Sequence, residues 1–460
     1  MIKNQFLFFS FFLFTLFSCT SNHPEKESVV SVAEQNKISV PFKAGEVISS
    51  VAVEQDPSQS YSLYLPKNYS DTSQFPVIIF FDPHGSGSYP LGKYSLLAER
   101  FGFILIGSNN SKNGMQFDQT NDIANKLIKE AAAMYSIDSK RISLAGFSGG
   151  SKVALVAAAN HPELLSVIYC GAAIAFGDMK QLPAALGYAG EGDMNYSEVI
   201  SSGSSLSEKM IEHFVIEWKG KHEWPDSLSF EDAFYWNSFI AMRNKLIVPS
   251  NELINQFLQR KMTLLIRSQS ILAQCNLYSQ VITFLDGLAD VKGYQQKMAA
   301  LMKTDSFKKD FLIKQDLLQA ESNMKENYLQ CFEMKDESWW KDEITRMRNV
   351  KASDQEIMYK RLLGYLSLAS YSYSNNAIKQ NNFSAAQKFL SIYKLSDPEN
   401  SEQPFLSACL YARKGDSKKA IAFLREAIQM GLKDKAKIEK EESFDKLKTD
   451  PEFNQLISQL

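Results

Sequence analysis

The segment 43–246 alternates short apolar runs with stretches of helical spacing. Its β-rich runs predict strands at 60–65, 77–81, 103–107, 142–145, 165–170, 186–189 and 214–218. The run 77–81 is wholly apolar, as expected for a strand buried on both faces. The segment 121–135 has its apolar residues on one helical side, and 149–160 reads as a helix of small residues. This alternation predicts an α/β fold, a largely parallel sheet with helices on both faces.

From residue 247 to residue 460 the β-branched runs disappear, and apolar residues recur at helical spacing, which predicts an all-helical second domain. A period of about 34 residues relates two sets of positions: Ala386, Leu390, Tyr393 and Pro398, then Ala420, Leu424, Ala427 and Leu432. The pattern resembles tetratricopeptide repeats over residues 366–432, and the alternative is a helical bundle with a coincidental period. Such repeats present concave peptide-binding surfaces, so the resemblance implies a possible protein partner.

Chain length and net charge limit the number of domains and the kinds of partner that are expected. A chain of 460 residues exceeds one hydrophobic core, which favours two domains at 43–246 and 247–460. The formal net charge of -2 gives no sign of the basic face that nucleic-acid binding needs, so no nucleic-acid partner is expected. From residue 351 onward charges of both signs are interspersed, which predicts a solvated helical face.

The start of the chain has the features of an export signal. Lys3 precedes an apolar run at 6–17 that is short for a membrane span, so 1–18 is predicted to be a signal peptide. The sequence Leu-Phe-Ser-Cys at 16–19 resembles the bacterial lipobox, which implies lipid attachment at Cys19 and a membrane lipoprotein of the cell envelope. Residues 20–37 are largely polar, and 19–42 would form a flexible tether. The alternative is an ordinary cleaved signal with a cysteine nearby by chance.

The remaining cysteines give no metal or disulfide pattern. Four are widely spaced, and none forms a metal-ligand pair: Cys170, Cys275, Cys331 and Cys409. They are predicted to be buried free thiols, although an exported protein could oxidise a pair.

The strongest chemical signal is Gly-Phe-Ser-Gly-Gly at 146–150, between a predicted strand and a predicted helix. In the motif G-x-S-x-G the serine sits on a strained turn, where flanking glycines avoid clashes with strand and helix. The turn exposes the hydroxyl of Ser148 beside the amino terminus of the helix. Ser148 is therefore the candidate nucleophile, and a glycine-rich turn without chemistry is the alternative.

A serine needs a base to remove its proton, and the chain has five histidines. His222 follows the predicted strand 214–218 and lies at the carboxyl edge of the sheet, the edge of Ser148. The other four are expected in the tether, in a loop, at a helix end and at the wrong edge of the sheet: His23, His84, His161 and His213. Elimination thus favours His222 as the base.

Asp193 follows the predicted strand 186–189 and is the candidate acid that orients the histidine. The order Ser, Asp, His along the chain is the order of α/β-hydrolase triads. Glu191 and then Asp178 are the nearest competitors, and Asp193 could also be an ordinary turn residue.

An oxyanion hole should complete the site. The backbone N–H of Gly149, directly after the serine, is the first expected donor. The second should come from the loop 82–88, where Gly85 or Ser86 would donate and His84 would hold the loop. Access is expected to be shaped by loops at 108–120 and 194–207. Trp224 and Tyr196 are expected to line an aromatic pocket for an acyl group or a sugar, and packing in the core is the alternative for Trp224.

Residues 61–236 resemble the α/β-hydrolase branch that contains polyhydroxybutyrate depolymerases and feruloyl esterases. The matching pieces are Asp-Pro-His-Gly at 82–85, residues 141–150, and Gly-Lys-His-Glu-Trp-Pro at 220–225. The resemblance implies hydrolysis of small or polymer-linked carboxylic esters through an acyl-enzyme, with no metal or organic cofactor. Two other functions stay open, a serine peptidase with the same triad and a binding or assembly protein with a vestigial hydrolase domain.

Overall fold

The computed structural model describes residues 42–177, 179, 181–351 and 354–460. The predicted signal peptide, Cys19, nearly all of the tether and Asp178 lie outside the described residues. Among the helices of the described stretches, none has the length and hydrophobicity to cross a membrane.

One sheet of eight strands organises the first half of the described chain. The strands are β1 (Val47–Val53), β2 (Asp56–Tyr64), β3 (Phe75–Phe81), β4 (Ile104–Ser108), β5 (Ile137–Phe147), β6 (Ser166–Cys170), β7 (Ala184–Gly190) and β8 (His213–Trp218). Their order is β1-β2-β4-β3-β5-β6-β7-β8, and only the pairings of β1 with β2 and of β2 with β4 are antiparallel. The carboxyl ends of β3 to β8 therefore meet at one edge of the sheet.

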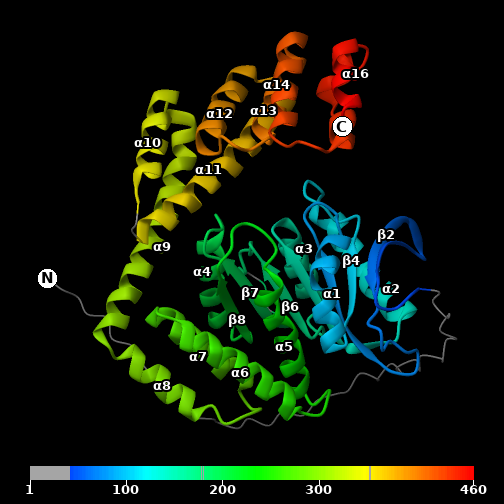
Figure 1. Cartoon of the computed structure of the whole chain (residues 1–460), viewed down its shortest axis with the longest axis vertical. Coiled ribbons are helices and arrows are strands. Elements are labelled where there is room, and N and C mark those ends of the chain that lie inside the picture. The colour runs from blue at the N-terminus through cyan, green and yellow to red at the C-terminus, as the bar shows by residue number, and fades with distance from the viewer. Residues whose placement is uncertain (1–41, 178, 180, 352–353) are drawn as a thin grey trace, which may run out of the picture. The chain divides into compact units, whose positions relative to one another are not determined.

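Alternate side chains of β3 feed two different cores, because successive residues of a strand point to opposite faces. Val77 and Ile79 pack with α2 (Phe117–Met134), α3 (Gly149–Asn160) and α4 (Tyr196–Glu208). Ile78 and Phe80 pack with α1 (Ser88–Phe101) and α5 (Ser227–Arg243). Figure 1 shows these helices around the strands. The predicted α/β-hydrolase fold, a mostly parallel sheet covered on both faces, is confirmed.

Every predicted strand overlaps an observed one, but four elements were missed: β1, α1, α4 and α5. The expectation of a loop over 194–207 is wrong, because residues 196–208 form α4. This helix is rich in Ser and contains Gly203, and both residue types have a low intrinsic preference for helices. Its buried Tyr196, Val199 and Leu206 pack against the sheet, so tertiary contacts override the local preference.

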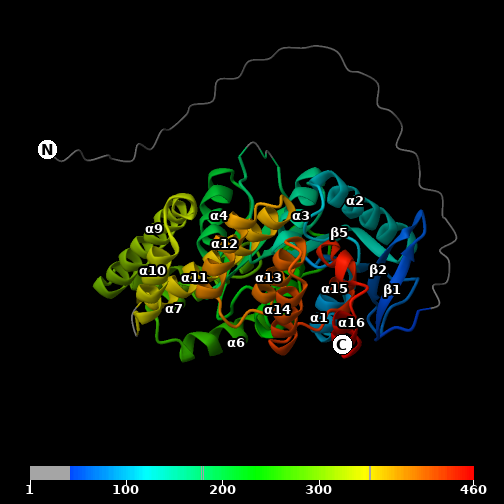
Figure 2. The ribbon, with the colours of Figure 1, turned by 90° about the horizontal axis from the view of Figure 1, so that it is seen from above.

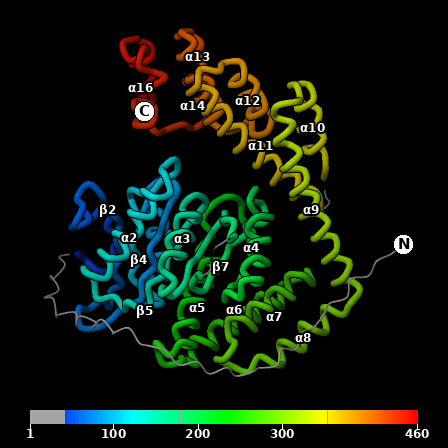
Figure 3. Tube along the Cα trace, turned by 180° about the vertical axis from the view of Figure 1, so that it is seen from behind, coloured from blue at the N-terminus to red at the C-terminus, as the bar shows by residue number. Residues whose placement is uncertain are grey.

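The second half of the chain is helical throughout the described residues. Its helices are α6 (Asn251–Arg267), α7 (Ile271–Leu285), α8 (Lys292–Met302), α9 (Asp305–Met334), α10 (Glu337–Asn349), α11 (Asp354–Lys379), α12 (Phe383–Ser396), α13 (Glu402–Arg413), α14 (Ser417–Gln429), α15 (Lys435–Lys440) and α16 (Pro451–Ser458), with a 3₁₀ turn at Glu442–Leu447. Figure 3 shows the chain passing from α7 through α8 into the long helix α9. The all-helical region predicted from residue 247 is confirmed.

The core beneath α5 continues into α6 and α7. Phe257 of α6 stacks on Phe284 of α7 with ring centroids 5.3 Å apart, and Phe284 also contacts Trp236 of α5. All three side chains belong to the core that contains Ile78 and Phe80. The face of the sheet that carries Ile78 and Phe80 is thus covered by α5, which precedes residue 246 in the chain, and by α6 and α7, which follow it.

Helices α11 and α12 pack as a pair, as do α13 and α14 (Figure 2). Seven of the eight positions related by the sequence period are buried in the core of these helices, and Pro398 is exposed. The small side chains of Ser374, Ala377 and Ala408 are buried too, which lets the paired helices approach closely. The resemblance to tetratricopeptide repeats stays a prediction.

The four described cysteines are free and buried, as predicted: Cys170, Cys275, Cys331 and Cys409. Burial raises the pKa of each of these thiols, most strongly for Cys170 and Cys409.

Candidate active site

Ser148 occupies the sharp turn between β5 and α3. Its φ of 53° and ψ of -120° lie outside the regions that a residue with a side chain normally adopts. The backbone N–H of Ser148 donates to the carbonyl oxygen of Cys170 at 2.8 Å, which ties the turn to the neighbouring strand β6. Such strain persists only where surrounding contacts enforce it, and it is common at functional sites.

Of the three glycines around Ser148, Gly146 and Gly150 are required by close backbone approaches, whereas Gly149 faces a side chain. A Cβ atom on Gly146 would lie 2.1 Å from the carbonyl oxygen of Gly150. A Cβ atom on Gly150 would lie 2.0 Å from the carbonyl oxygen of Phe81, at the end of β3. On Gly149 it would lie 1.8 Å from Oδ1 of Asn113. The two backbone contacts cannot be relieved by a side-chain rotation, so Gly146 and Gly150 of the motif are needed for the turn itself.

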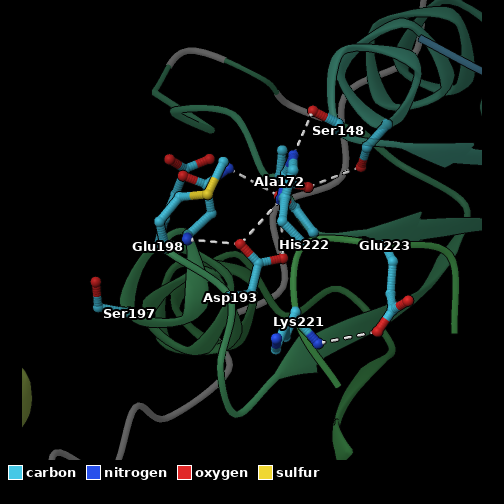
Figure 4. A network of polar contacts seen from close by, with 12 residues as sticks. Ser148, Ala172, Asp193, Ser197, Glu198, Lys221, His222 and Glu223 are labelled. Carbon is cyan, nitrogen blue, oxygen red and sulfur yellow. Dashed lines mark hydrogen bonds and ion pairs between the residues drawn. The ribbon is translucent and has the colours of Figure 1, made fainter. Parts of the chain in front are cut away.

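The structure brings the three predicted side chains into one hydrogen-bonded chain (Figure 4). Oγ of Ser148 lies 2.9 Å from Nε2 of His222, whose Nδ1 lies 2.9 and 3.0 Å from the two carboxylate oxygens of Asp193. His222 comes from the loop after β8, and Asp193 from the turn after β7. All three therefore lie at the carboxyl edge of the sheet.

The contact with Asp193 fixes the tautomer of His222. A carboxylate can only accept hydrogen bonds, so Nδ1 carries the proton and Nε2 is left to accept from the serine hydroxyl. Asp193 is 1% exposed, and its Oδ1 also accepts the backbone N–H of Asn195 at 2.8 Å. The imidazole is thereby held in the orientation and protonation that deprotonation of Ser148 requires.

The other described histidines have different partners. His84 forms an isolated β-bridge with Lys112, and His161 contacts Asn125 and Glu163 at the end of α3. Nδ1 of His213 contacts the carbonyl oxygen of Ile211 at the amino end of β8. Of the competing acids, Glu191 uses its backbone N–H and carbonyl in contacts with Trp218 and Arg361.

The predicted oxyanion loop at 82–88 and the predicted access loop at 108–120 lie against each other. The N–H of Asn113 donates to the carbonyl oxygen of Pro83 at 2.8 Å, which joins the loop after β4 to the loop after β3. Gly85 has φ of +70°, and its N–H donates to the carbonyl oxygen of Asp82 at 3.1 Å. Among the described residues, none accepts a hydrogen bond from the Ser86 N–H. Gly149 opens α3, so its N–H has no partner within the helix.

Asn113 was not identified from the sequence. Its amide oxygen approaches Gly149, directly beside Ser148. No sequence signal singles it out, since asparagine is common in loops. Its position depends on the contact between two loops that are distant along the chain.

Asp82 links the β3 loop to the histidine loop. It is buried, and its two carboxylate oxygens accept the N–H of His84 and the indole N–H of Trp224, each at 2.9 Å. Trp224 is therefore a packing residue, one of the two alternatives considered for it. Tyr196 is also buried, and its hydroxyl donates to Glu217. Burial and this carboxylate raise the pKa of Tyr196 well above its usual range.

Comparison with known proteins finds no matching family model. The chain is 27% identical over 150 residues to acetylxylan esterase A of Aspergillus ficuum, an alignment covering 29% of this chain and 49% of that protein. It is 28% identical over 125 residues to acetylxylan esterase A of Aspergillus awamori, covering 24% and 41%. The chain thus spans about half or less of the length of these curated relatives.

Comparison with solved structures gives alignments over less than half of this chain. An S-formylglutathione hydrolase from Staphylococcus aureus aligns with a TM-score of 0.36 and 14% identity, over 43% of this chain and 98% of its own. Esterase B from Lactobacillus rhamnosis aligns with a TM-score of 0.37 and 14% identity, over 44% and 87%.

Proposed function

We propose that this chain is a serine hydrolase that cleaves carboxylic esters through an acyl-enzyme on Ser148. The observation that carries the proposal is the continuous hydrogen-bonded chain from Ser148 through His222 to Asp193. Three further features support the proposal: Asp193 is buried, His222 has a defined tautomer, and a strained turn presents Ser148.

The reaction would run in two half-reactions. Nε2 of His222 takes the proton of Ser148 as Oγ bonds to the ester carbonyl carbon, and the carbonyl oxygen becomes an oxyanion. The tetrahedral intermediate collapses to an acyl-serine, and His222 passes its proton to the departing alcohol. A water molecule then repeats the sequence, releasing the carboxylic acid and restoring the serine hydroxyl. Asp193 stabilises the imidazolium that forms twice in each cycle.

The oxyanion would be bound by the backbone N–H groups of Gly149 and Ser86. Gly149 follows the nucleophile at the amino terminus of α3, where N–H groups have no partner inside the helix. Ser86 is preferred to Gly85 because the N–H of Gly85 already donates to Asp82. The β3 loop is held for this role by Asp82 and by the bridge between His84 and Lys112.

The substrate class we favour is a short acyl ester of a carbohydrate. The curated relatives are named acetylxylan esterases, which supports an acetyl group on a sugar hydroxyl. A triad alone does not distinguish esters from amides, so a peptidase is the competing function.

The test combines a probe with a substrate panel. A fluorophosphonate should label the full chain on the tryptic peptide that contains Ser148, and acetylated xylan fragments and p-nitrophenyl acetate should be hydrolysed faster than aminoacyl anilides. Absence of labelling would refute the hydrolase assignment. Faster turnover of anilides would refute the ester preference while leaving the serine mechanism intact.

We also propose that a lipid on Cys19 anchors the protein to a membrane of the cell envelope, on the strength of the lipobox-like residues 16–19. The variant Cys19→Ser should move the protein from the membrane pellet to the soluble fraction after cell lysis, because it removes the acceptor thiol. Cys275→Ser, which alters a buried free thiol, is the matched control and should stay in the pellet. Retention of Cys19→Ser in membranes would contradict lipidation.

A further inference from the structure

The turn that carries Asp193 is contacted by charged side chains from the helical region. Within the turn itself, the N–H of Asp193 donates to the carbonyl oxygen of Gly190, and the N–H of Gly192 donates to the carbonyl oxygen of Gly220 in the loop after β8. Two carbonyl groups that flank Asp193, those of Glu191 and Met194, accept hydrogen bonds from α11 and α9 instead. The acid is thus held partly by residues far away along the chain.

Arg361 of α11 makes the first of these contacts. Its Nη1 donates to the carbonyl oxygen of Glu191 at 3.0 Å, and its Nε and Nη2 donate to Oε2 of Glu321 at 2.8 and 2.5 Å. The guanidinium carbon also lies 4.5 Å from the ring centroid of Tyr196, the first residue of α4. Arg361 is only 6% exposed, so these hydrogen bonds and the ring contact fix its position.

Lys325 of α9 makes the second contact. Its Nζ donates to the carbonyl oxygen of Met194 at 2.6 Å, to Oγ of Ser197 at 3.0 Å and to Oε1 of Glu321 at 2.7 Å. All three donor positions of the ammonium group are therefore used. Met194 directly follows Asp193, so Lys325 fixes the chain on the far side of the acid.

Glu321 joins the two cations. Its carboxylate is completely buried and accepts hydrogen bonds from Arg361 and Lys325 on its two different oxygens. A buried carboxylate is stable only when it is paired in this way, so the three side chains hold one another in place. Gly364 of α11 faces Met194 without a side chain, and a Cβ atom there would already touch Met194 at 3.5 Å. The helix thus lies directly on the acid turn.

We propose that Arg361, together with Lys325 and Glu321, positions Asp193 for catalysis, so that the helical region is a working part of the hydrolase site. The inference rests on the proposed function of the triad. These residues touch no reacting atom; they act by fixing the backbone on both sides of the acid. Without them the turn would sample orientations in which Asp193 no longer contacts Nδ1 of His222.

The test compares Arg361→Met and Lys325→Met with Arg348→Met in the full-length chain. Arg348 is the control because it too is a cation that donates to backbone carbonyl groups, but those of Leu395 and Ser396, which lie within the helical region. Activity is expressed per active site titrated with fluorophosphonate, so a smaller folded fraction does not count as a lower kcat. We expect kcat to fall about tenfold to a hundredfold in the first two variants at unchanged KM, because a displacement of about 1 Å has an effect of this size. Arg348→Met should keep the kcat of the parent.

A spectroscopic readout separates positioning from general stability. The His222 Nδ1–H, protected by its hydrogen bond to Asp193, should give a far-downfield proton resonance in the parent and in Arg348→Met. This resonance should be lost or broadened in Arg361→Met and partly restored in Arg361→Lys, which keeps one donor. If Arg361→Met does not fold, Lys325→Met decides the question. Parent-like kcat and an intact resonance in Lys325→Met and in any folded Arg361→Met would overturn the inference. A parent that hydrolyses no ester would refute the proposed function instead, and the resonance would still report on the position of the acid.

Discussion

Ser148→Ala is expected to lower kcat for ester hydrolysis by about 10⁶-fold and to abolish fluorophosphonate labelling. The variant removes the atom that forms the acyl bond, and no other described hydroxyl is hydrogen-bonded to His222. His222→Ala should have an effect of about the same size, because an unactivated serine contributes almost nothing to the rate. The double variant should be no worse than either single one, since the two groups act as a unit.

The measurement is steady-state hydrolysis of p-nitrophenyl acetate together with gel fluorescence of the labelled chain. Ser201→Ala is a suitable control because Ser201 is exposed on α4 and its hydroxyl donates only to the carbonyl oxygen of Glu198. The control should retain both signals. Labelling that survives Ser148→Ala would mean that another serine is the nucleophile.

Asp193→Asn should lower kcat by about 10⁴-fold while leaving the thermal midpoint of unfolding close to that of the parent. An asparagine amide has the size of the carboxylate, but its NH₂ group can donate to Nδ1 of His222. The imidazole would then carry its proton on Nε2, which faces the Ser148 hydroxyl at 2.9 Å and could no longer accept its proton. The positions of the three side chains would be kept, but the proton of His222 would be on Nε2 instead of Nδ1.

Rates of fluorophosphonate labelling and of ester turnover should fall in parallel for Asp193→Asn, because both reactions need the activated serine. Glu223→Gln provides the control, since Glu223 is exposed and its carboxylate only accepts the backbone N–H of Lys221. Glu191 was the nearest alternative acid in the sequence. A loss of activity in Glu191→Gln together with an active Asp193→Asn would show that the acid has been assigned incorrectly.

The strands and the position of the site could be predicted because each depends on a short stretch of sequence. Buried parallel strands appear as continuous apolar runs, and parallel strands end at the same edge. Three polar residues that follow the ends of β5, β7 and β8 must therefore lie near one another, although 74 residues separate Ser148 from His222. The steric need for glycine around Ser148 made the turn recognisable as well.

The support of the acid turn could not be predicted, because it depends on the packing of distant helices. Interspersed charges beyond residue 351 predicted a solvated face, and for Arg361 this is wrong, since its side chain is buried against Glu321. An arginine inside a run of mixed charges has the same local pattern whether it faces water or a buried carboxylate. A water-facing arginine and a buried one are distinguished only by the structure, in which α9 and α11 contact each other and both contact the turn that carries Asp193.

Because the core continues past Leu246, the position of the junction matters when helices of this chain are replaced by those of another protein. Phe284 of α7 covers Trp236, and Phe257 of α6 packs on Phe239. A fusion made at residue 247 would therefore leave aromatic rings in water and favour aggregation. A junction after Val291, the last buried residue of that core, would keep the rings covered. Swapping in foreign helices there would still remove Arg361 and Lys325, so such a hybrid should be soluble but a poor catalyst.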